Sequence, residues 1–382
     1  MNSDIMGGLA VFGGLAGYVV PFLFVLTAVV FFHELGHFLV ARWCGIKVLT
    51  FSIGFGPEIV GFDDRRGTRW KLSAIPLGGY VRFFGDSNEA SASDQAALAQ
   101  MSEGERRRSF AAQSVIRRAA VVVAGPIANF ILAILIFAGI FMAVGKQTAS
   151  PRVDAVQPGS AAAAAGFKPG DLVLSIDGTK IDSFADMQRI VSISAGETLT
   201  VVVDRGGVPV TLKATPQLHE VKDNFGNVQR IGVLGISRSM APGDIKTQKM
   251  GPVEAVRTGA EETWFLVERT LAYIGGVFMG REPADQLGGP IRIAQVSSEV
   301  ASVGFTALIH LTAVLSVSIG LLNLFPIPML DGGHLLFYGI EALRGRPLSE
   351  RAQEMGMRIG LAIVVMLMIF ATFNDILHLA TS

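Results

Sequence analysis

The hydrophobic residues of the chain gather in four long segments separated by more polar stretches. No Asp, Glu, Lys or Arg interrupts residues 5–32, 119–145 or 305–330, and a fourth apolar stretch begins at residue 359. An α-helix needs about 20 apolar residues to cross the hydrocarbon core of a bilayer. The pattern therefore predicts a polytopic α-helical membrane protein with four transmembrane helices.

Basic residues concentrate in two of the connections between these segments, which predicts the orientation of the chain. The first connection is rich in Lys and Arg from residue 42 to residue 118, and the last holds Arg344, Arg346, Arg351 and Arg358. Short loops with an excess of Lys and Arg face the cytoplasm. We therefore expect both termini, and the long segment between the second and third helices, on the opposite side of the membrane.

The overall composition agrees with a membrane protein that also carries polar domains. Half of the residues are hydrophobic, 17% are charged, and the mean hydropathy is +0.48, which is too apolar for an ordinary soluble enzyme. The formal net charge is zero, so nothing suggests nucleic acid as a partner. Cys44 is the single cysteine, and an internal disulfide is excluded.

Residues 46–85 have the composition of β-strands rather than of a loop. Residues 48–53 and 68–75 are rich in β-branched and aromatic side chains, and the turn-like run 63–67 separates them. Glycines that allow close backbone approach punctuate these strands, at Gly54, Gly56, Gly78 and Gly79. We expect a membrane-associated or re-entrant β-sheet whose backbone receives substrate; a cytoplasmic sheet without contact to the site is the alternative.

The segment at 150–217 has the strand and turn order of a small mixed α/β domain. Its run Gly166-Phe-Lys-Pro-Gly-Asp-Leu-Val-Leu-Ser-Ile-Asp-Gly178 predicts a turn, a strand and a second turn, and a helix at 183–193 and two more strands follow. The run resembles a PDZ domain of the bacterial protease type. That resemblance implies a groove for peptide ends along residues 151–156 and the helix; a domain that only blocks access is the alternative.

The predicted domains follow one another along the chain, and an amphipathic helix at 252–279 is expected to lie on the outer leaflet. The order is a first transmembrane helix at 1–45, the β-sheet at 46–85, a cytoplasmic loop at 86–118, a second transmembrane helix at 119–145, one PDZ domain at 150–217, an interfacial segment at 218–304, a third transmembrane helix at 305–331, a cytoplasmic loop at 332–358 and a fourth transmembrane helix at 359–380.

The motif His33-Glu34-Leu-Gly-His37 stands at the cytoplasmic end of the first predicted membrane helix. Residues i and i+4 share a helix face, so both imidazoles can reach one metal ion, while Glu34 is placed to take a proton from water. Ionisable groups are costly inside a membrane and need a partner. A zinc ion satisfies such a cluster better than the alternative, a hydrogen-bonded polar knot between helices.

The third metal ligand is expected at the matching depth of the third membrane helix. Pro326 and Pro328 interrupt the helix there, which predicts that Asp331 sits on unwound backbone, free to face the metal. Glu341 and Asp375 are placed less well, and His334 is favoured as a supporting residue. Two histidines, one carboxylate and an open fourth position are typical of a catalytic zinc site.

Two motifs lie on either side of the PDZ-like segment, His33-Glu-x-x-His37 and Asn323-x-x-Pro-x-Pro-x-Leu-Asp-Gly332. Together they resemble the site-2 protease family, and within it the bacterial regulator of sigma-E protease. The resemblance extends over nearly the whole chain, including Gly125-Pro-x-x-Asn129. The best-known members carry two tandem PDZ domains, and we find one.

The resemblance implies an intramembrane zinc endopeptidase in the bacterial inner membrane, with the PDZ domain and both termini periplasmic. Its implied substrates are single-span membrane proteins of the anti-sigma factor type and remnant signal peptides, and Asn323 is implied to hold the substrate main chain. Two other classes stay open: a metal-ion transporter, and a PDZ-bearing membrane adaptor with a vestigial metal site.

Overall fold

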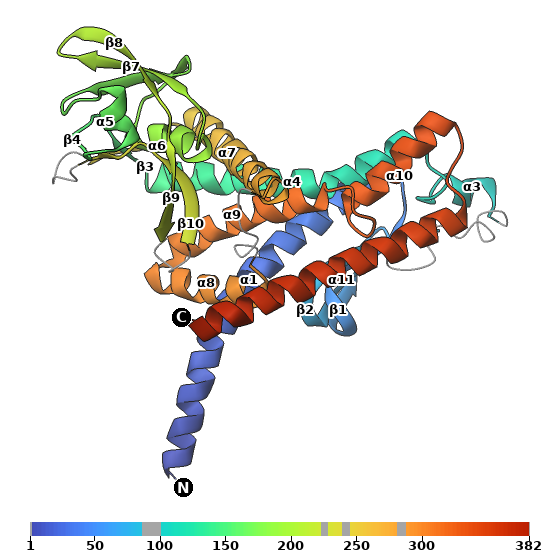
Figure 1. The fold of residues 1–382 in the computed structure, drawn as a ribbon. Coiled ribbons are helices and arrows are strands. Elements are labelled where there is room, and N and C mark those ends of the chain that lie inside the picture. Colours follow the sequence, from blue (N-terminus) through green and yellow to red (C-terminus); the bar gives the residue numbers. More distant parts are fainter. Residues whose placement is uncertain (1, 86–100, 223–227, 239–244, 281–287, 382) are drawn as a thin grey trace. The chain divides into compact units, whose positions relative to one another are not determined.

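The computed structural model describes residues 2–85, 101–222, 228–238, 245–280 and 288–381 (Figure 1). The chain forms two compact units. The first unit comprises Met1–Phe137 and Gly288–Thr381, and the second comprises Ala138–Leu287.

Four helices contain segments that are long and apolar enough to cross a membrane, as the hydrophobic pattern predicts. These segments are Gly17–Trp43, Val115–Ala143, Phe305–Asn323 and Arg351–Leu377. They belong to α1 (Asn2–Trp43), α4 (Val115–Ala143), α9 (Phe305–Asn323) and α11 (Glu350–Thr381). Length and composition thus identify a membrane protein.

The third apolar helix ends earlier than the sequence predicts. Helix α9 stops at Asn323, and a separate helix, α10 (Asp331–Arg344), occupies the start of the predicted 332–358 loop. Prolines at 326 and 328 lack the backbone N–H that would continue α9. The expectation of unwound backbone at Asp331 is therefore wrong, because that residue begins α10 directly after the break.

Strands β1 (Val48–Asp63) and β2 (Arg69–Phe83) form an antiparallel pair that folds back on itself. Residues 50–53 of β1 pair on one side with 69–72 and on the other side with 79–82, and 60–63 pair again with 69–72. Gly54 marks the bend of β1, with a φ of +87° that favours glycine. Two long strands thus make a small sheet of four segments, with residues 79–83 at one edge.

A cluster of apolar side chains joins this sheet to the helices of the first unit. Phe51 of β1 lies against Phe38 of α1, with ring centroids 5.5 Å apart, and stacks on Trp70 of β2 at 4.2 Å. The same core includes Val121 and Val122 of α4. Burial of these large side chains fixes the sheet beside the ends of α1 and α4 that carry the candidate site.

Two further helices complete what is described of the first unit. Helix α8 (Pro290–Val303) has its N-terminus capped by Asp375 of α11, which accepts hydrogen bonds from the backbone N–H groups of Gly289 at 2.8 Å and Arg292 at 3.1 Å. The short α3 (Glu103–Arg106) lies inside the predicted 86–118 loop, of which residues 86–100 fall outside the described part.

The second unit is built on a four-stranded antiparallel sheet of order β6-β5-β7-β8. Its strands are β5 (Leu172–Ile176), β6 (Thr179–Lys180), β7 (Leu199–Arg205) and β8 (Val208–Ala214). Helices α5 (Ala161–Ala165) and α6 (Phe184–Ile193) accompany it, and Ser183 caps α6 by accepting from the N–H of Asp186. Helix α6 and strands β7 and β8 lie where the sequence predicts them.

The core of this unit extends past residue 217. Leu234 is 4% exposed and packs in the same cluster as Val173 and Val203. Later strands return to pair with earlier ones, and β9 pairs with β10 in a hairpin. The remaining strands are β3 (Lys146–Ala149), β4 (Ala155–Val156), β9 (Gln217–Lys222), β10 (Val228–Val233), β11 (Ile236–Ser237) and β12 (Ile245–Gln248).

Residues 151–156, along which a peptide groove is expected, pair in part with other segments of the second unit. On one side, Val153 donates to the carbonyl of Asp171 at 2.8 Å. On the other side β4 pairs with β11, with Ala155 opposite Ser237. Part of this segment is therefore already paired within the unit, and a peptide groove along residues 151–156 and α6 stays a prediction.

Helix α7 (Pro252–Phe278) follows β12 and agrees with the predicted amphipathic helix. Its Ala255, Thr258 and Thr263 are buried, whereas Trp264, Leu271 and Phe278 are exposed. The ion pair between Arg189 of α6 and Glu262 joins α7 to the rest of the second unit.

Candidate metal site

Helix α1 brings His33 and His37 together one turn apart. Their ring centroids lie 4.8 Å apart, and both side chains are buried. The Nδ1 of His37 lies 2.8 Å from the carbonyl oxygen of Val121 on α4. Since a carbonyl only accepts, His37 donates from Nδ1, and its Nε2 keeps a free lone pair.

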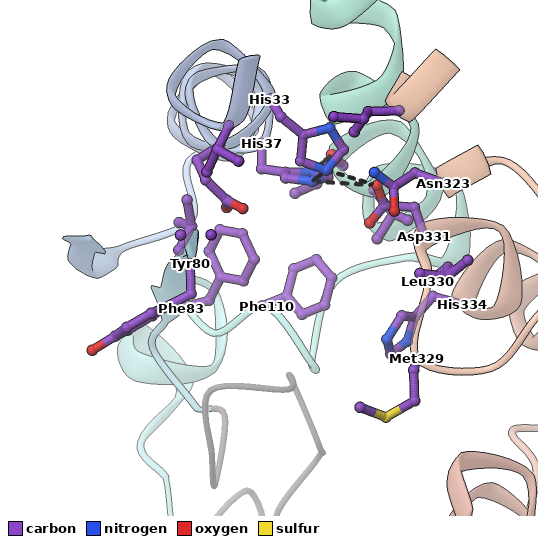
Figure 2. Close-up of a pocket in the computed structure, with 18 of the residues that line it drawn as sticks. His33, His37, Tyr80, Phe83, Phe110, Asn323, Met329, Leu330, Asp331 and His334 are labelled. Carbon is purple, nitrogen blue, oxygen red and sulfur yellow. Dashed lines mark hydrogen bonds and ion pairs between the residues drawn. The ribbon is translucent and has the colours of Figure 1, made fainter. Parts of the chain in front are cut away.

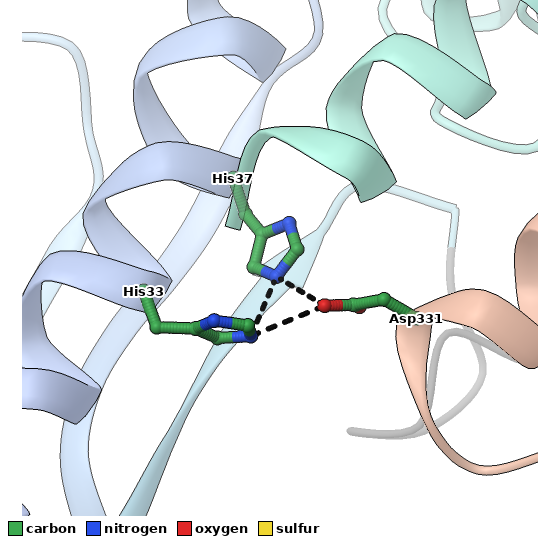
Figure 3. A group of neighbouring side chains, drawn as sticks. All are labelled: His33, His37 and Asp331. Carbon is green, nitrogen blue, oxygen red and sulfur yellow. Dashed lines mark hydrogen bonds and ion pairs between the residues drawn. The ribbon is translucent and has the colours of Figure 1, made fainter. Parts of the chain in front are cut away.

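Helix α10 brings Asp331 to the two imidazoles across almost 300 residues of sequence (Figure 3). Its Oδ2 lies 3.2 Å from Nε2 of His33 and 3.5 Å from Nε2 of His37. The two Nε2 atoms are 3.2 Å apart. Among the described residues, these three form the group of potential metal ligands.

The spacing of these three atoms fits a zinc ion. Zinc bonds of about 2.0–2.1 Å at tetrahedral angles place ligand atoms about 3.3 Å from one another. The three observed separations run from 3.2 to 3.5 Å. The Oδ2 of Asp331 is also buried without a hydrogen-bond partner in the described part of the chain, which a metal bond would remedy.

A cavity of about 320 Å³ adjoins the triad (Figure 2). Glu34 lines it from α1, Asn323 from the end of α9, and Gly78 and Gly79 from β2. Gly54 and Gly56 do not line it, although both are described. Seven of the nine candidate residues therefore line one cavity, and the two glycines of β1 do not. The seven are His33, Glu34, His37, Gly78, Gly79, Asn323 and Asp331.

The competing acids have other partners. Glu341 forms an ion pair with Arg118 of α4 at 2.6 Å, which holds α10 against α4. Asp375 caps α8. His334 lines the cavity, so it stands near the ligands without joining the triad.

Several residues that line the cavity were missed by the sequence reasoning. Figure 2 shows Tyr80 and Phe83 of β2 on the side opposite Asp331 and Asn323, with Phe110 between them. Tyr338 of α10 and Met357 of α11 also line the cavity. These side chains carry no motif, and only long-range packing brings them to the site.

Comparison with known proteins identifies the family. Residues 21–367 match the model of Peptidase family M50. An Agrobacterium fabrum protein named "Putative zinc metalloprotease Atu1380" is 54% identical over 368 residues, which cover 96% of this chain and 98% of that protein. Metalloprotease MmpA of Caulobacter vibrioides is 42% identical over 380 residues, covering 94% of this chain and 95% of that protein.

A PDZ domain from Listeria monocytogenes matches 22% of this chain and 83% of its own length, at 21% identity and a TM-score of 0.18, which is too low to show a shared fold. The match to the family model and the two relatives cover nearly the whole chain, including both metal motifs. The chain belongs to Peptidase family M50, the site-2 protease family, and is a zinc metalloprotease.

Proposed function

We propose that this metalloprotease cuts single-span membrane proteins within the bilayer. One observation carries the proposal: two of its three candidate ligands, and Glu34, lie on α1 within Gly17–Trp43, a segment long and apolar enough to cross a membrane. The third ligand, Asp331, begins the helix that follows the break after another such segment, Phe305–Asn323. A protease site among these helices suits substrates that are themselves embedded in lipid.

The proposed catalysis divides between the bound ion and Glu34. His33, His37 and Asp331 would hold the zinc ion, which would supply Lewis-acid chemistry and lower the pKa of water toward about 7. Glu34 lines the same cavity, where it accepts the proton of the attacking water and returns it to the leaving amine. Asn323, at the cavity wall, is proposed to hold the substrate main chain.

A helical substrate must be unwound before its carbonyls can react, and the freed backbone groups then need partners. The edge segment 79–83 of β2 lines the cavity at Gly79, Tyr80 and Val81. An extended substrate added to this edge would find backbone hydrogen-bond partners beside the triad. Gly54 and Gly56 serve this sheet in the proposal by bending β1 rather than by touching substrate.

We further propose a location in the bacterial inner membrane, with both termini and the second unit periplasmic and the active site near the cytoplasmic side. The positions of the basic residues support this orientation. Within the second unit, residues 150–238 act as one PDZ domain that filters substrates. Substrates of the anti-sigma factor type and remnant signal peptides are the classes proposed.

Two other functions, a metal-ion transporter and a membrane adaptor, have less support. A metal-ion transporter needs polar groups along a route through the spans, whereas the buried polar side chains of the four apolar segments outside the site are Asn129, Thr312, Ser316 and Asp375. A membrane adaptor with a vestigial site needs an incomplete ligand set, whereas the potential ligand atoms of His33, His37 and Asp331 lie close enough together to share one metal ion.

The proposal is tested with purified protein in lipid vesicles containing a single-span model substrate. Glu34→Gln is expected to lower the cleavage rate by about 10²–10⁴-fold while the bound zinc stays at the wild-type level. His37→Ala, the matched variant, is expected to lose both. Undiminished cleavage by Glu34→Gln would remove Glu34 from this role, and a wild type that cuts only soluble peptides would exclude the intramembrane activity.

A further inference from the structure

Asn129 lies beside the metal triad, on α4, without belonging to it. Its side chain is fully buried, and its Nδ2 lies 3.3 Å from Nδ1 of His33. The α9 helix approaches from the other side, where the Ser316 hydroxyl donates to the backbone carbonyl of Asn129 at 2.8 Å. Asn129 thus connects α4 to the ligand face of α1.

The two histidines of the motif need the same tautomer. Figure 3 shows both rings with Nε2 directed toward Asp331. A neutral imidazole that binds a metal through Nε2 carries its hydrogen on Nδ1 and must donate that hydrogen to an acceptor. His37 has such an acceptor in the carbonyl of Val121. The side chain of Asn129 lies next to Nδ1 of His33, where an acceptor for its hydrogen is needed.

The carboxamide of Asn129 offers two different groups, and only one suits a metal-bound His33. An NH₂ group cannot accept the hydrogen of Nδ1, whereas the carboxamide oxygen can. That oxygen, Oδ1, is buried without a hydrogen-bond partner in the described part of the chain. A half-turn of the carboxamide exchanges the two groups and places Oδ1 at the acceptor position.

We propose that Asn129 is a positioning residue that accepts the Nδ1 hydrogen of His33 through Oδ1, and so fixes the metal-binding tautomer and ring orientation. This inference rests on the proposed function, because it takes His33 as a zinc ligand.

The ordinary alternative for a buried Asn in a membrane helix is to join helices by hydrogen bonds. Here the backbone of Asn129, not its side chain, receives the bond from Ser316. The side chain of Asn129 contacts His33 instead. Mutation can therefore separate the joining of helices through the backbone of Asn129 from the positioning of His33 by its side chain.

The test measures zinc release from purified full-length protein to a chromophoric chelator, together with zinc content by mass spectrometry. Asn129→Leu removes the acceptor and is expected to release zinc about 10–100-fold faster than wild type. Asn129→Asp keeps an acceptor oxygen and is expected to release zinc no faster than wild type. Ser316→Ala, the matched control, removes the helix-joining bond and is expected to keep the wild-type rate.

Four results would overturn the inference: wild-type release from Asn129→Leu, fast release from Asn129→Asp, fast release from Ser316→Ala, or equal release rates from the two Asn129 variants. If Asn129→Leu does not fold, Asn129→Ala, which also lacks an acceptor oxygen, replaces it and is expected to release zinc about 10–100-fold faster than wild type. His33→Ala tests the assignment of His33 as a zinc ligand. Zinc retained by that variant would refute the ligand set itself rather than the role of Asn129.

Discussion

Gly125 of α4 lies directly against His37 of α1. A Cβ atom built on Gly125 would stand 2.3 Å from Nε2 of His37 and 2.9 Å from Cε1 of His33. Real side chains do not approach so closely, so the site exists only because residue 125 has no side chain. Helix α4 supplies none of the three candidate metal ligands, but the absence of a side chain at Gly125 leaves the space that the two imidazoles occupy.

Replacement of Gly125 by alanine should remove zinc while leaving most of the fold. The added methyl group must displace the two imidazoles from the face where Asp331 meets them, and zinc affinity is expected to fall at least about tenfold. Zinc content of the purified variant checks this. Gly139→Ala on the same helix, where nothing lies within 4 Å, is the control and should retain its zinc. Full zinc in Gly125→Ala would contradict the assigned site.

The second unit should lose stability in acid through Asp171. The Arg205 guanidinium donates to this buried carboxylate at 2.8 Å from both Nε and Nη2, and it holds the pKa of Asp171 below its usual range, against burial, which raises it. A lowered pKa stabilises the fold at pH values above the unfolded pKa of about 3.9, and that stabilisation disappears as the pH falls through the folded value.

Asp171→Asn is therefore expected to speed hydrogen exchange of the β5 and β7 amides about tenfold at pH 7, because charge-assisted hydrogen bonds are lost. The difference from wild type should shrink as the pH falls below about 4. Asp182→Asn, which breaks an exposed pair with Lys180, should have no such effect. A difference that stays constant from pH 7 to pH 3 would show that the charge of Asp171 is not the cause.

The proposed filter can be removed along a line that the strand pairing defines. Ala149 of β3 and Ile245 of β12 are directly paired, so residues 150–244 can be replaced by a two-residue Asn-Gly turn that keeps this ladder. We expect the shortened protein to cut membrane substrates with folded periplasmic domains that the wild type rejects. Short substrates should be cut at the wild-type rate.

Deletion of 150–217 alone provides the comparison for this design. It removes the core around Val173 and Val203 but leaves Leu234 without its neighbours, and it is expected to give a poorly folded protein. Cleavage assays on the two substrate classes separate the outcomes. If the 150–244 replacement no longer cuts short substrates, the second unit does more than filter.

The sequence by itself determined the features that depend on local periodicity. Residues 33 and 37 share a helix face because they are four positions apart, so two ligands were predictable without a structure. The apolar runs predicted the membrane helices, and the helix at 183–193 was predicted from a short stretch of chain.

The tertiary structure alone decided what depends on residues distant in sequence. Prolines predicted a break before Asp331, but only packing shows that a new helix starts there and brings its carboxylate to the histidines. The structure alone also pairs Ala155 with Ser237, and the approach of α4 places Asn129 at His33. Such contacts join segments separated by tens to hundreds of residues, and no local pattern encodes which of the possible partners will meet, because the burial and hydrogen bonds that select them form only when the whole unit packs.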